Sequence, residues 1–196
     1  MHIDSDKALR LLSEGHVIAL PTDTVYGLAA SVYHQKALED IFTLKQRCVR
    51  KPLVIQVGDV KDVRAFSSSL PKGFDSIAKA FWPGPLTIVI DVDISVVPEV
   101  IRCGLVTTGF RVPGHEEVRA LLRKSGPLAI TSANVSGEYD ARTAEEVESF
   151  FGVDFPVLSI DSQSSGVPST VVGYVDGSWK VFREGMISYD KIKDCL

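Results

Sequence analysis

Short runs of apolar, often β-branched residues alternate with amphipathic segments along the whole chain. Such runs are typical of buried strands, and the segments between them have the apolar spacing of helices. We predict strands at 16–20, 53–57, 86–92, 106–112, 128–130, 157–160, 169–175 and 179–183. We predict helices at 4–14, 35–46, 60–66, 72–81, 115–124, 143–151 and 188–195. The dipeptide Asp176-Gly177 predicts a tight hairpin between the last two strands.

This alternation predicts an α/β (α+β-like) fold, with one open, twisted, mixed sheet flanked by helices. The chain has 196 residues, of which 45% are hydrophobic, so it is long enough to bury a core without disulfides. No internal repeat, charged tail or Gly/Pro-rich linker divides it. We therefore expect a single domain over residues 1–196.

Composition excludes several classes of protein. The three cysteines are far apart and make no metal-type pair, which favours a reducing, cytoplasmic setting. No apolar run approaches the ~20 residues that span a bilayer, and no basic-then-apolar leader is present, so we expect a soluble, unprocessed protein without membrane partners. The formal net charge of −4 argues against an overall attraction to nucleic acid.

The first predicted strand ends at Pro21, and three short polar side chains follow it: Thr22, Asp23 and Thr24. The chain becomes apolar again at Val25. Loops that leave strand ends are where a rigid scaffold presents functional groups. The alternative is a turn whose side chains bond to their own backbone. The local sequence leaves both interpretations open.

Other predicted strand ends and loops are also rich in hydroxyls and cations: Lys45-x-Arg47, Thr107-Thr108-x-x-Arg111, Thr131-Ser132-Ala133-Asn134, Ser169-Thr170 and Arg183. Neither common phosphate-binding glycine loop is present, and the four histidines share no metal-ligand or triad spacing. Cations suit carboxylates and phosphates, and a site without a nucleophile suits nucleotidyl or phosphoryl transfer by positioning and charge neutralisation. The alternative is that each cluster is a solvated surface or a capped strand end.

Six motifs in order resemble the YrdC/TsaC family of threonylcarbamoyl-AMP synthases. They are residues 21–28, 44–47 with 51–53, 82–87, 111–113, 131–137 and 168–172. Six motifs in family order over nearly the whole chain are far more specific than any one of them. Two positions depart from the pattern: Cys48 stands where many members have proline, and Gln56 where several have histidine.

The resemblance implies an open twisted sheet of YrdC type with a concave, locally basic face. It implies that L-threonine, bicarbonate and ATP are joined into threonylcarbamoyl-adenylate with release of pyrophosphate. Mg²⁺ would accompany the ATP, and downstream transferase proteins would pass the group to adenosine 37 of tRNA. The chain ends about where the shorter members end, and residues 162–168 are the candidate segment to cover the site.

The resemblance also assigns roles to residues. Lys45 and Arg47 would be catalytic and would line the triphosphate with Lys51. The threonine would be bound by four residues: Thr24, Arg111, Thr131 and Ser169. The rest of the nucleotide would be held by Thr107, the backbone at Ala133, Asn134, Arg142 and Arg183. No protein metal ligand is implied.

Two other functions compete with this one. A non-catalytic module that binds double-stranded RNA or tRNA through the basic face would use Lys45, Arg47, Arg50 and Lys51, but the net charge and the lack of interleaved aromatics weigh against it. A related carbamoyl-transferring domain with another substrate would usually alter the Lys-x-Arg or Ser-x-Asn motif, and both are intact here.

Overall fold

The computed structural model describes residues 1–46, 51–161 and 164–196, whose strands form one mixed sheet. The order across the sheet is β1-β8-β2-β3-β7-β4-β6-β5-β9-β10. The strands are β1 His2–Ile3, β2 Ile18–Leu20, β3 Gly27–Ser31, β4 Val54–Gln56, β5 Leu86–Asp91, β6 Thr107–Arg111, β7 Leu128–Ser132, β8 Val157–Leu158, β9 Thr170–Val175 and β10 Ser178–Arg183. The sheet contains both parallel pairs (β1/β8, β2/β8, β4/β6, β5/β9) and antiparallel pairs (β2/β3, β3/β7, β4/β7, β5/β6, β9/β10), which confirms the predicted mixed sheet.

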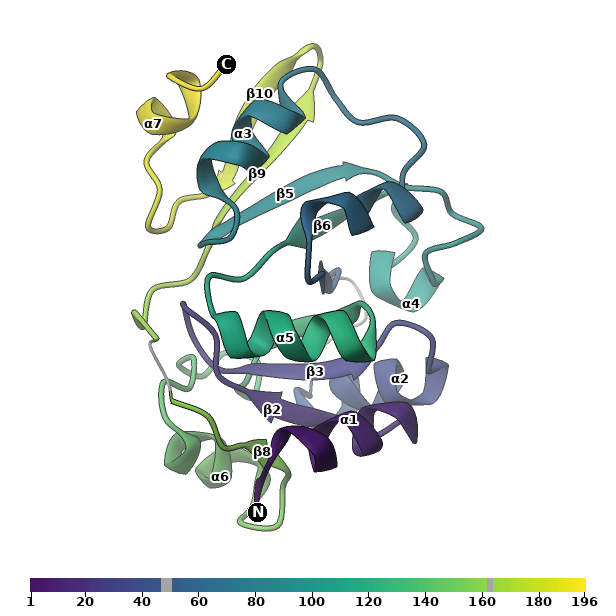
Figure 1. Cartoon of the computed structure of the whole chain (residues 1–196), viewed down its shortest axis with the longest axis vertical. Coiled ribbons are helices and arrows are strands. Elements are labelled where there is room, and N and C mark those ends of the chain that lie inside the picture. Colours follow the sequence, from purple (N-terminus) through teal and green to yellow (C-terminus); the bar gives the residue numbers. More distant parts are fainter. Residues whose placement is uncertain (47–50, 162–163) are drawn as a thin grey trace.

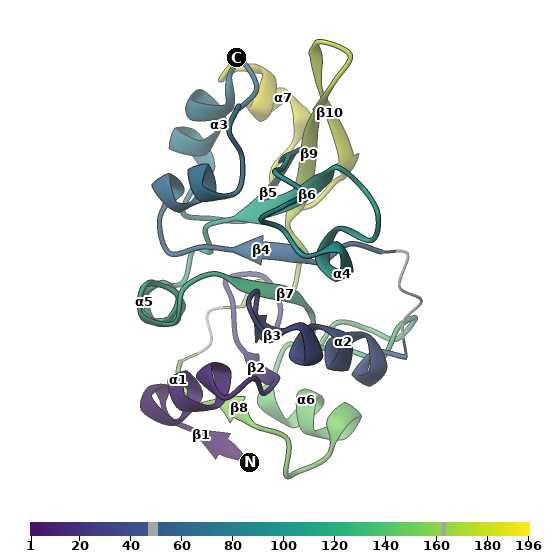
Figure 2. The same ribbon diagram turned by 90° about the vertical axis from the view of Figure 1, so that its right-hand side faces the viewer.

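Helices cover both faces of the half of the sheet that contains β2, β3 and β7 (Figures 1 and 2). In Figure 2, α1 and α5 lie on one side of this half and α2 and α6 on the other. The second half, with β5, β9 and β10, carries α3 (Figure 1). The helices are α1 Ser5–Ser13, α2 Gln35–Leu44, η1 Val60–Ala65, α3 Phe74–Phe81, α4 Glu99–Arg102, α5 Glu116–Ser125, α6 Ala144–Phe151 and α7 Tyr189–Lys193.

The core follows from the two-residue period of the strands. In β2, Ile18 and Leu20 pack into the apolar cluster under α1 and α5, whereas Ala19 faces the larger cluster that contains α2, α3 and α6. In β3, Ala29 belongs to the first cluster and its neighbours Leu28 and Ala30 to the second. Strands that are buried on both faces hold the centre of the sheet rigid, and the site described below is built on them.

Side chains cap the N-termini of two helices. The side chain of Asp4 caps α1 by accepting from the Lys7 amide at 2.8 Å, a contact that stabilises a helix by about 1 kcal/mol. Thr143 caps α6 by accepting from the Glu146 amide at 3.2 Å. The carboxylate of Glu146 accepts from the Arg142 amide at 2.6 Å, so only one of the two hydrogen bonds of a capping box is formed.

The Asp176-Gly177 turn has φ of 52° and 77° at its two residues, as a two-residue hairpin requires. The segment predicted as a helix at 60–66 is a 3-10 helix, η1. Strands β1 and β3 and helix α4 were not predicted from the sequence.

Among the described residues, no helix has both the length and the apolar character needed to cross a bilayer.

Candidate functional site

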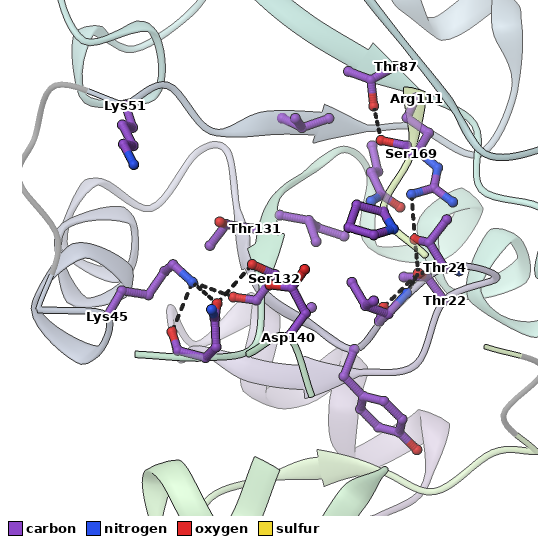
Figure 3. A pocket seen from close by; sticks show the side chains of 18 of the residues that line it. Thr22, Thr24, Lys45, Lys51, Thr87, Arg111, Thr131, Ser132, Asp140 and Ser169 are labelled. Atoms are coloured by element: carbon purple, nitrogen blue, oxygen red, sulfur yellow. Dashed lines mark hydrogen bonds between the residues drawn. The ribbon is translucent and has the colours of Figure 1, made fainter. Parts of the chain in front are cut away.

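A cavity of about 340 Å³ lies across the middle of the sheet. Its lining comes from strands β3, β7, β4, β6 and β5 and from the loops around them. Figure 3 shows Lys45 and Lys51 at one end of the cavity and Thr24, Arg111 and Ser169 at the other. Predicted site residues from distant parts of the sequence therefore share one cavity. We call these two ends the lysine end and the arginine end.

The loop between β2 and β3 combines both interpretations that the sequence left open. The Thr22 hydroxyl accepts from the amides of Thr24 and Val25 at 3.1 and 3.3 Å and donates to the Val25 carbonyl at 2.7 Å, so it shapes the loop. The Thr24 hydroxyl lies 2.9 Å from that of Thr22 and lines the cavity. Thr22 therefore holds the turn, and Thr24 presents its hydroxyl to the cavity.

Arg111, the last residue of β6, is buried at the arginine end. Its guanidinium donates from Nη1 to the Thr24 hydroxyl at 2.8 Å, from Nη2 to Asp23 at 2.5 Å, and from Nε to the Gly84 carbonyl at 3.0 Å. A guanidinium has five N–H groups. One N–H on each terminal nitrogen therefore has no protein acceptor in the described part of the chain. A carboxylate needs two such groups for a bidentate pair.

Burial lowers the pKa of the Arg111 guanidinium, and the attraction and hydrogen bond of Asp23 oppose this shift. The positive charge of Arg183 lowers the Arg111 pKa further. Arginine keeps its proton in proteins, so Arg111 remains a cation although it is buried. A buried cation with spare donors is a strong attractor for an anionic ligand.

Ser169 completes the arginine end from the start of β9. Its hydroxyl lies 2.8 Å from that of Thr87 on β5. Arg183, the last residue of β10, donates from Nε and Nη2 to the Ser169 carbonyl at 3.1 and 2.9 Å and from Nη2 to its hydroxyl at 3.2 Å. Arg183 therefore holds Ser169 in position, and both residues line the cavity.

Lys45 follows α2 and is buried at the lysine end. Its ammonium donates to the carbonyls of Ser132 and Asn134 at 2.5 and 2.9 Å and to the Asn134 Oδ1 at 2.6 Å. The Asn134 amide nitrogen donates in turn to the Glu138 carbonyl at 2.6 Å. These contacts engage three donors of Lys45, so this lysine ties α2 to the turn after β7.

Residues 164–166 hold the Thr24 loop from outside. The amides of Ser165 and Gly166 donate to the carbonyls of Asp23 and Thr24 at 3.1 and 2.8 Å, and the Ser164 hydroxyl also donates to the Thr24 carbonyl. The predicted covering segment, 162–168, is therefore bonded to the arginine end where the structure describes it. Residues 162 and 163 lie outside the described residues.

Most of the predicted site residues line this cavity: Thr24, Lys45, Lys51, Arg111, Thr131, Asn134, Ser169 and Arg183. Arg47 lies outside the described residues, as does Cys48. Ala133 is buried beside the cavity, and its amide donates to the Tyr26 carbonyl at 2.8 Å. Arg142 is not in the lining and packs against Gly166.

The structure does not bring Thr107 to this cavity. The sequence analysis grouped Thr107 with Arg111, but β6 rises by about 3.3 Å per residue, so four residues separate them by roughly 13 Å. Thr107 lines a second cavity of about 430 Å³ beside β5, β9 and β10. Its predicted contact with the nucleotide stays a prediction.

Thr87 and Asp140 line the cavity without having been predicted as site residues, and Ser132 lines it as a member of the predicted cluster 131–134. Asp140 is the one carboxylate among the described residues of the lining and lies near Ser132 in Figure 3. Nothing in its local sequence distinguishes it from a surface aspartate. Gln56 also lines the cavity, paired in register with Arg111, and its buried Oε1 has no hydrogen-bond partner among the described residues.

The sequences of known proteins align with most of this chain. The threonylcarbamoyl-AMP synthase of Pyrococcus abyssi is 35% identical over 191 residues, which cover 96% of this chain and 56% of that protein. The enzyme of the same name from Marinobacter nauticus is 37% identical over 70% of this chain and 73% of its own length. This chain therefore spans little more than half of the Pyrococcus relative.

Solved structures agree with the sequence relatives. The crystal structure of P. abyssi Sua5 complexed with L-threonine superposes with a TM-score of 0.94 at 31% identity, over 100% of this chain and 61% of that one. Escherichia coli YciO has a TM-score of 0.84 at 22% identity, a likeness of fold. The family model Sua5_yciO_yrdC, with the description Telomere recombination, matches residues 10–185. From the motifs, the fold and these matches, we conclude that the chain belongs to the Sua5/YciO/YrdC family.

Proposed function

We propose that this chain is a nucleotidyltransferase that joins L-threonine, bicarbonate and ATP into threonylcarbamoyl-adenylate, releasing pyrophosphate and water. The observation that carries the proposal is Arg111, a buried cation with two spare N–H groups beside the Thr24 hydroxyl, in the same cavity as Lys51. An amino acid and a polyphosphate can then occupy one cavity together.

The arginine end suits threonine. The two spare N–H groups of Arg111 would take its carboxylate, and the hydroxyls of Thr24, Thr131 and Ser169 line the same space for its polar groups. Because Thr24 and Ser169 are already fixed by hydrogen bonds, they lose little freedom when the ligand binds.

The lysine end suits the nucleotide. Lys51 is exposed and makes no ion pair with the described residues, so its ammonium is available to phosphate oxygens. We propose that Lys51 and Arg47 contact the triphosphate, that Lys45 holds Asn134 and Ser132 in place beside it, and that Arg183 and Asn134 contact the rest of the nucleotide. Attack of threonine carbamate on the α-phosphate then depends on alignment and charge neutralisation by these residues.

Mg²⁺ fits this cavity as a partner of the nucleotide. The described residues contain no cluster of three or more His, Cys, Asp or Glu side chains, so the protein alone offers no complete metal site. Asp140 supplies one carboxylate, and Mg²⁺ is commonly held by one or two carboxylates together with substrate phosphates. When bound, the ion would neutralise charge on the phosphates.

The wider setting is also part of the proposal: a cytoplasmic enzyme whose product is used by a transferase that modifies tRNA. The competing function, a module that binds RNA without catalysis, is less well supported. The cations of the cavity are confined to a hollow with a buried guanidinium, whereas RNA-binding surfaces expose their cations along a face.

The test is pyrophosphate release from ATP in the presence of threonine and bicarbonate. We expect release to require both, and serine to support it less well. Release that is unchanged when threonine is omitted would contradict the proposal. Strong, salt-sensitive tRNA binding without adenylate formation would instead favour the binding module.

A further inference from the structure

Asp23 forms an ion pair with Arg111 next to the cavity. It lies between Thr22 and Thr24, yet its side chain is not part of the cavity lining. Its Oδ1 accepts from the Nη2 of Arg111 at 2.5 Å, and the side chains are 15% and 5% exposed respectively. No role was assigned to this carboxylate in the proposed reaction.

A glycine leaves room for the carboxylate. A Cβ on Gly114 would lie 2.9 Å from the Asp23 Oδ2 and 3.3 Å from the Cα of Gly84. The Gly84 carbonyl also accepts from the Nε of Arg111. Asp23, Gly84 and Thr24 therefore fix the guanidinium, and a side chain at residue 114 would displace the Asp23 carboxylate.

The ion pair changes which anions the arginine end attracts. An unpaired buried guanidinium attracts any anion, and a polyphosphate more strongly than a carboxylate because it carries more charge. Pairing with Asp23 makes the two side chains neutral together and leaves two N–H groups to donate. A single carboxylate can use those donors, whereas the several negative charges of a phosphate chain are repelled by Asp23.

We propose that Asp23 is a positioning residue that makes the arginine end selective for a carboxylate over phosphate. The inference rests on the proposed function, in which a polyphosphate and an amino acid must enter one cavity at different ends. Without Asp23, phosphate groups would compete for Arg111 and occupy the place of the amino acid. Specificity of this kind depends on a repulsive element as well as an attractive one.

The test is calorimetric titration of threonine into the whole chain at increasing concentrations of inorganic phosphate. In the wild-type protein we expect phosphate to change the threonine Kd by less than about twofold. In Asp23→Asn, which keeps an acceptor for Arg111 but removes the charge, we expect the same phosphate range to raise the Kd by on the order of tenfold. The control Asp75→Asn removes one exposed charge elsewhere and should behave as wild type.

A second variant distinguishes the effect of the position of the Asp23 carboxylate from the effect of its charge. Gly114→Ala displaces the Asp23 carboxylate but leaves its charge, so we expect weaker threonine binding that phosphate does not weaken further. Circular dichroism shows whether each variant is folded. If Asp23→Asn does not fold, phosphate resistance together with weakened threonine binding in Gly114→Ala still supports the inference, and threonine binding unchanged from wild type in Gly114→Ala overturns it.

The outcomes separate the two proposals. If folded Asp23→Asn shows the wild-type response to phosphate, the inference about Asp23 is wrong while the proposed function stands. If the wild-type chain binds no threonine, the proposed function fails. In that case direct phosphate titration decides the inference: a phosphate site gained in Asp23→Asn supports it, and no gain overturns it.

Discussion

The two ends of the cavity are built differently. At the arginine end, Arg111, Thr24 and Ser169 are buried and joined by hydrogen bonds to one another or to their neighbours before any ligand is bound. At the lysine end, Lys51 is exposed, whereas Lys45 is buried. Buried, preorganised charges act in a low dielectric and tolerate little change, whereas exposed charges are screened by water and salt. The comparison predicts that substitutions at the arginine end have the larger effects.

The largest effect is expected for Arg111→Ala. It removes the donors for the amino acid and leaves the half-buried carboxylate of Asp23 unpaired. Breaking a fully buried ion pair typically costs about 3–5 kcal/mol of unfolding free energy, so we expect a loss of up to this size. We expect threonine binding to weaken on the order of a hundredfold, and ATP binding far less. Calorimetry with each substrate measures both.

Arg111→Lys is the matched control, because it keeps the charge but not the planar fork. It should restore much of the stability and little of the threonine binding. Equal losses of threonine and ATP binding in Arg111→Ala would contradict the proposal that the two ends of the cavity bind different substrates.

Lys45→Met is expected to rank second. It leaves the acceptors on Ser132 and Asn134 without their lysine donor, which should lower the free energy of unfolding by about 1–3 kcal/mol in urea denaturation. The control Lys79→Met, at an exposed position of α3, should change stability little. If Lys45→Met proves as stable as this control, Lys45 is not the tether between α2 and the turn after β7.

Lys51→Ala should have a smaller effect. Its ammonium is exposed, so we expect ATP binding to weaken by up to about tenfold at low salt and by less as salt increases. Threonine binding without ATP should be unchanged, as should both affinities in Lys61→Ala, which removes an exposed lysine from η1. A loss that salt does not reduce would mean that the lysine end is less open to solvent than the structure indicates.

The smallest effect tests a surface site away from the cavity. Partial burial raises the pKa of Asp59, but hydrogen bonds and attraction from Arg123 and Arg119 outweigh it, so the pKa is lowered overall. A lowered pKa in the folded state gives stability that is present above the unfolded pKa of ~3.9 and is lost as the pH falls through the folded value. Asp59→Asn should therefore flatten the acid side of the stability profile below about pH 4. A profile parallel to wild type would show that solvent screens this cluster completely.

Sequence patterns predicted the elements that have strong local signals. The β-branched run of β5, the capped helices α1 and α6 and the Asp176-Gly177 hairpin were found, since their determinants are close in sequence. Strand β3 was missed because Gly27-Leu28-Ala29-Ala30-Ser31 has little intrinsic β propensity and forms a strand through its pairing with β2 and β7. Tertiary context decides such segments.

The site was predicted best where motif residues lie at the end of a strand or directly beside one. Arg111 is the last residue of β6, and Ser169 immediately precedes β9. Thr107 begins β6, at the opposite end of the strand from Arg111, and lines the second cavity. Asp140 and Gln56 were not predicted as members of the site from residue chemistry, because their place in the lining depends on how the sheet and the loop after β7 meet.

The cavity joins the two halves of the sheet, since Thr24 comes from the half that carries β2 and β3, and Arg111 from the half that carries β5 and β6. A ligand that contacts both residues connects the two halves of the sheet. Because the ligand binds only when the two halves are together, its binding free energy opposes their separation. By linkage, binding raises the melting temperature of the whole sheet rather than of one region. When the ligand leaves, this stabilisation of the sheet is lost.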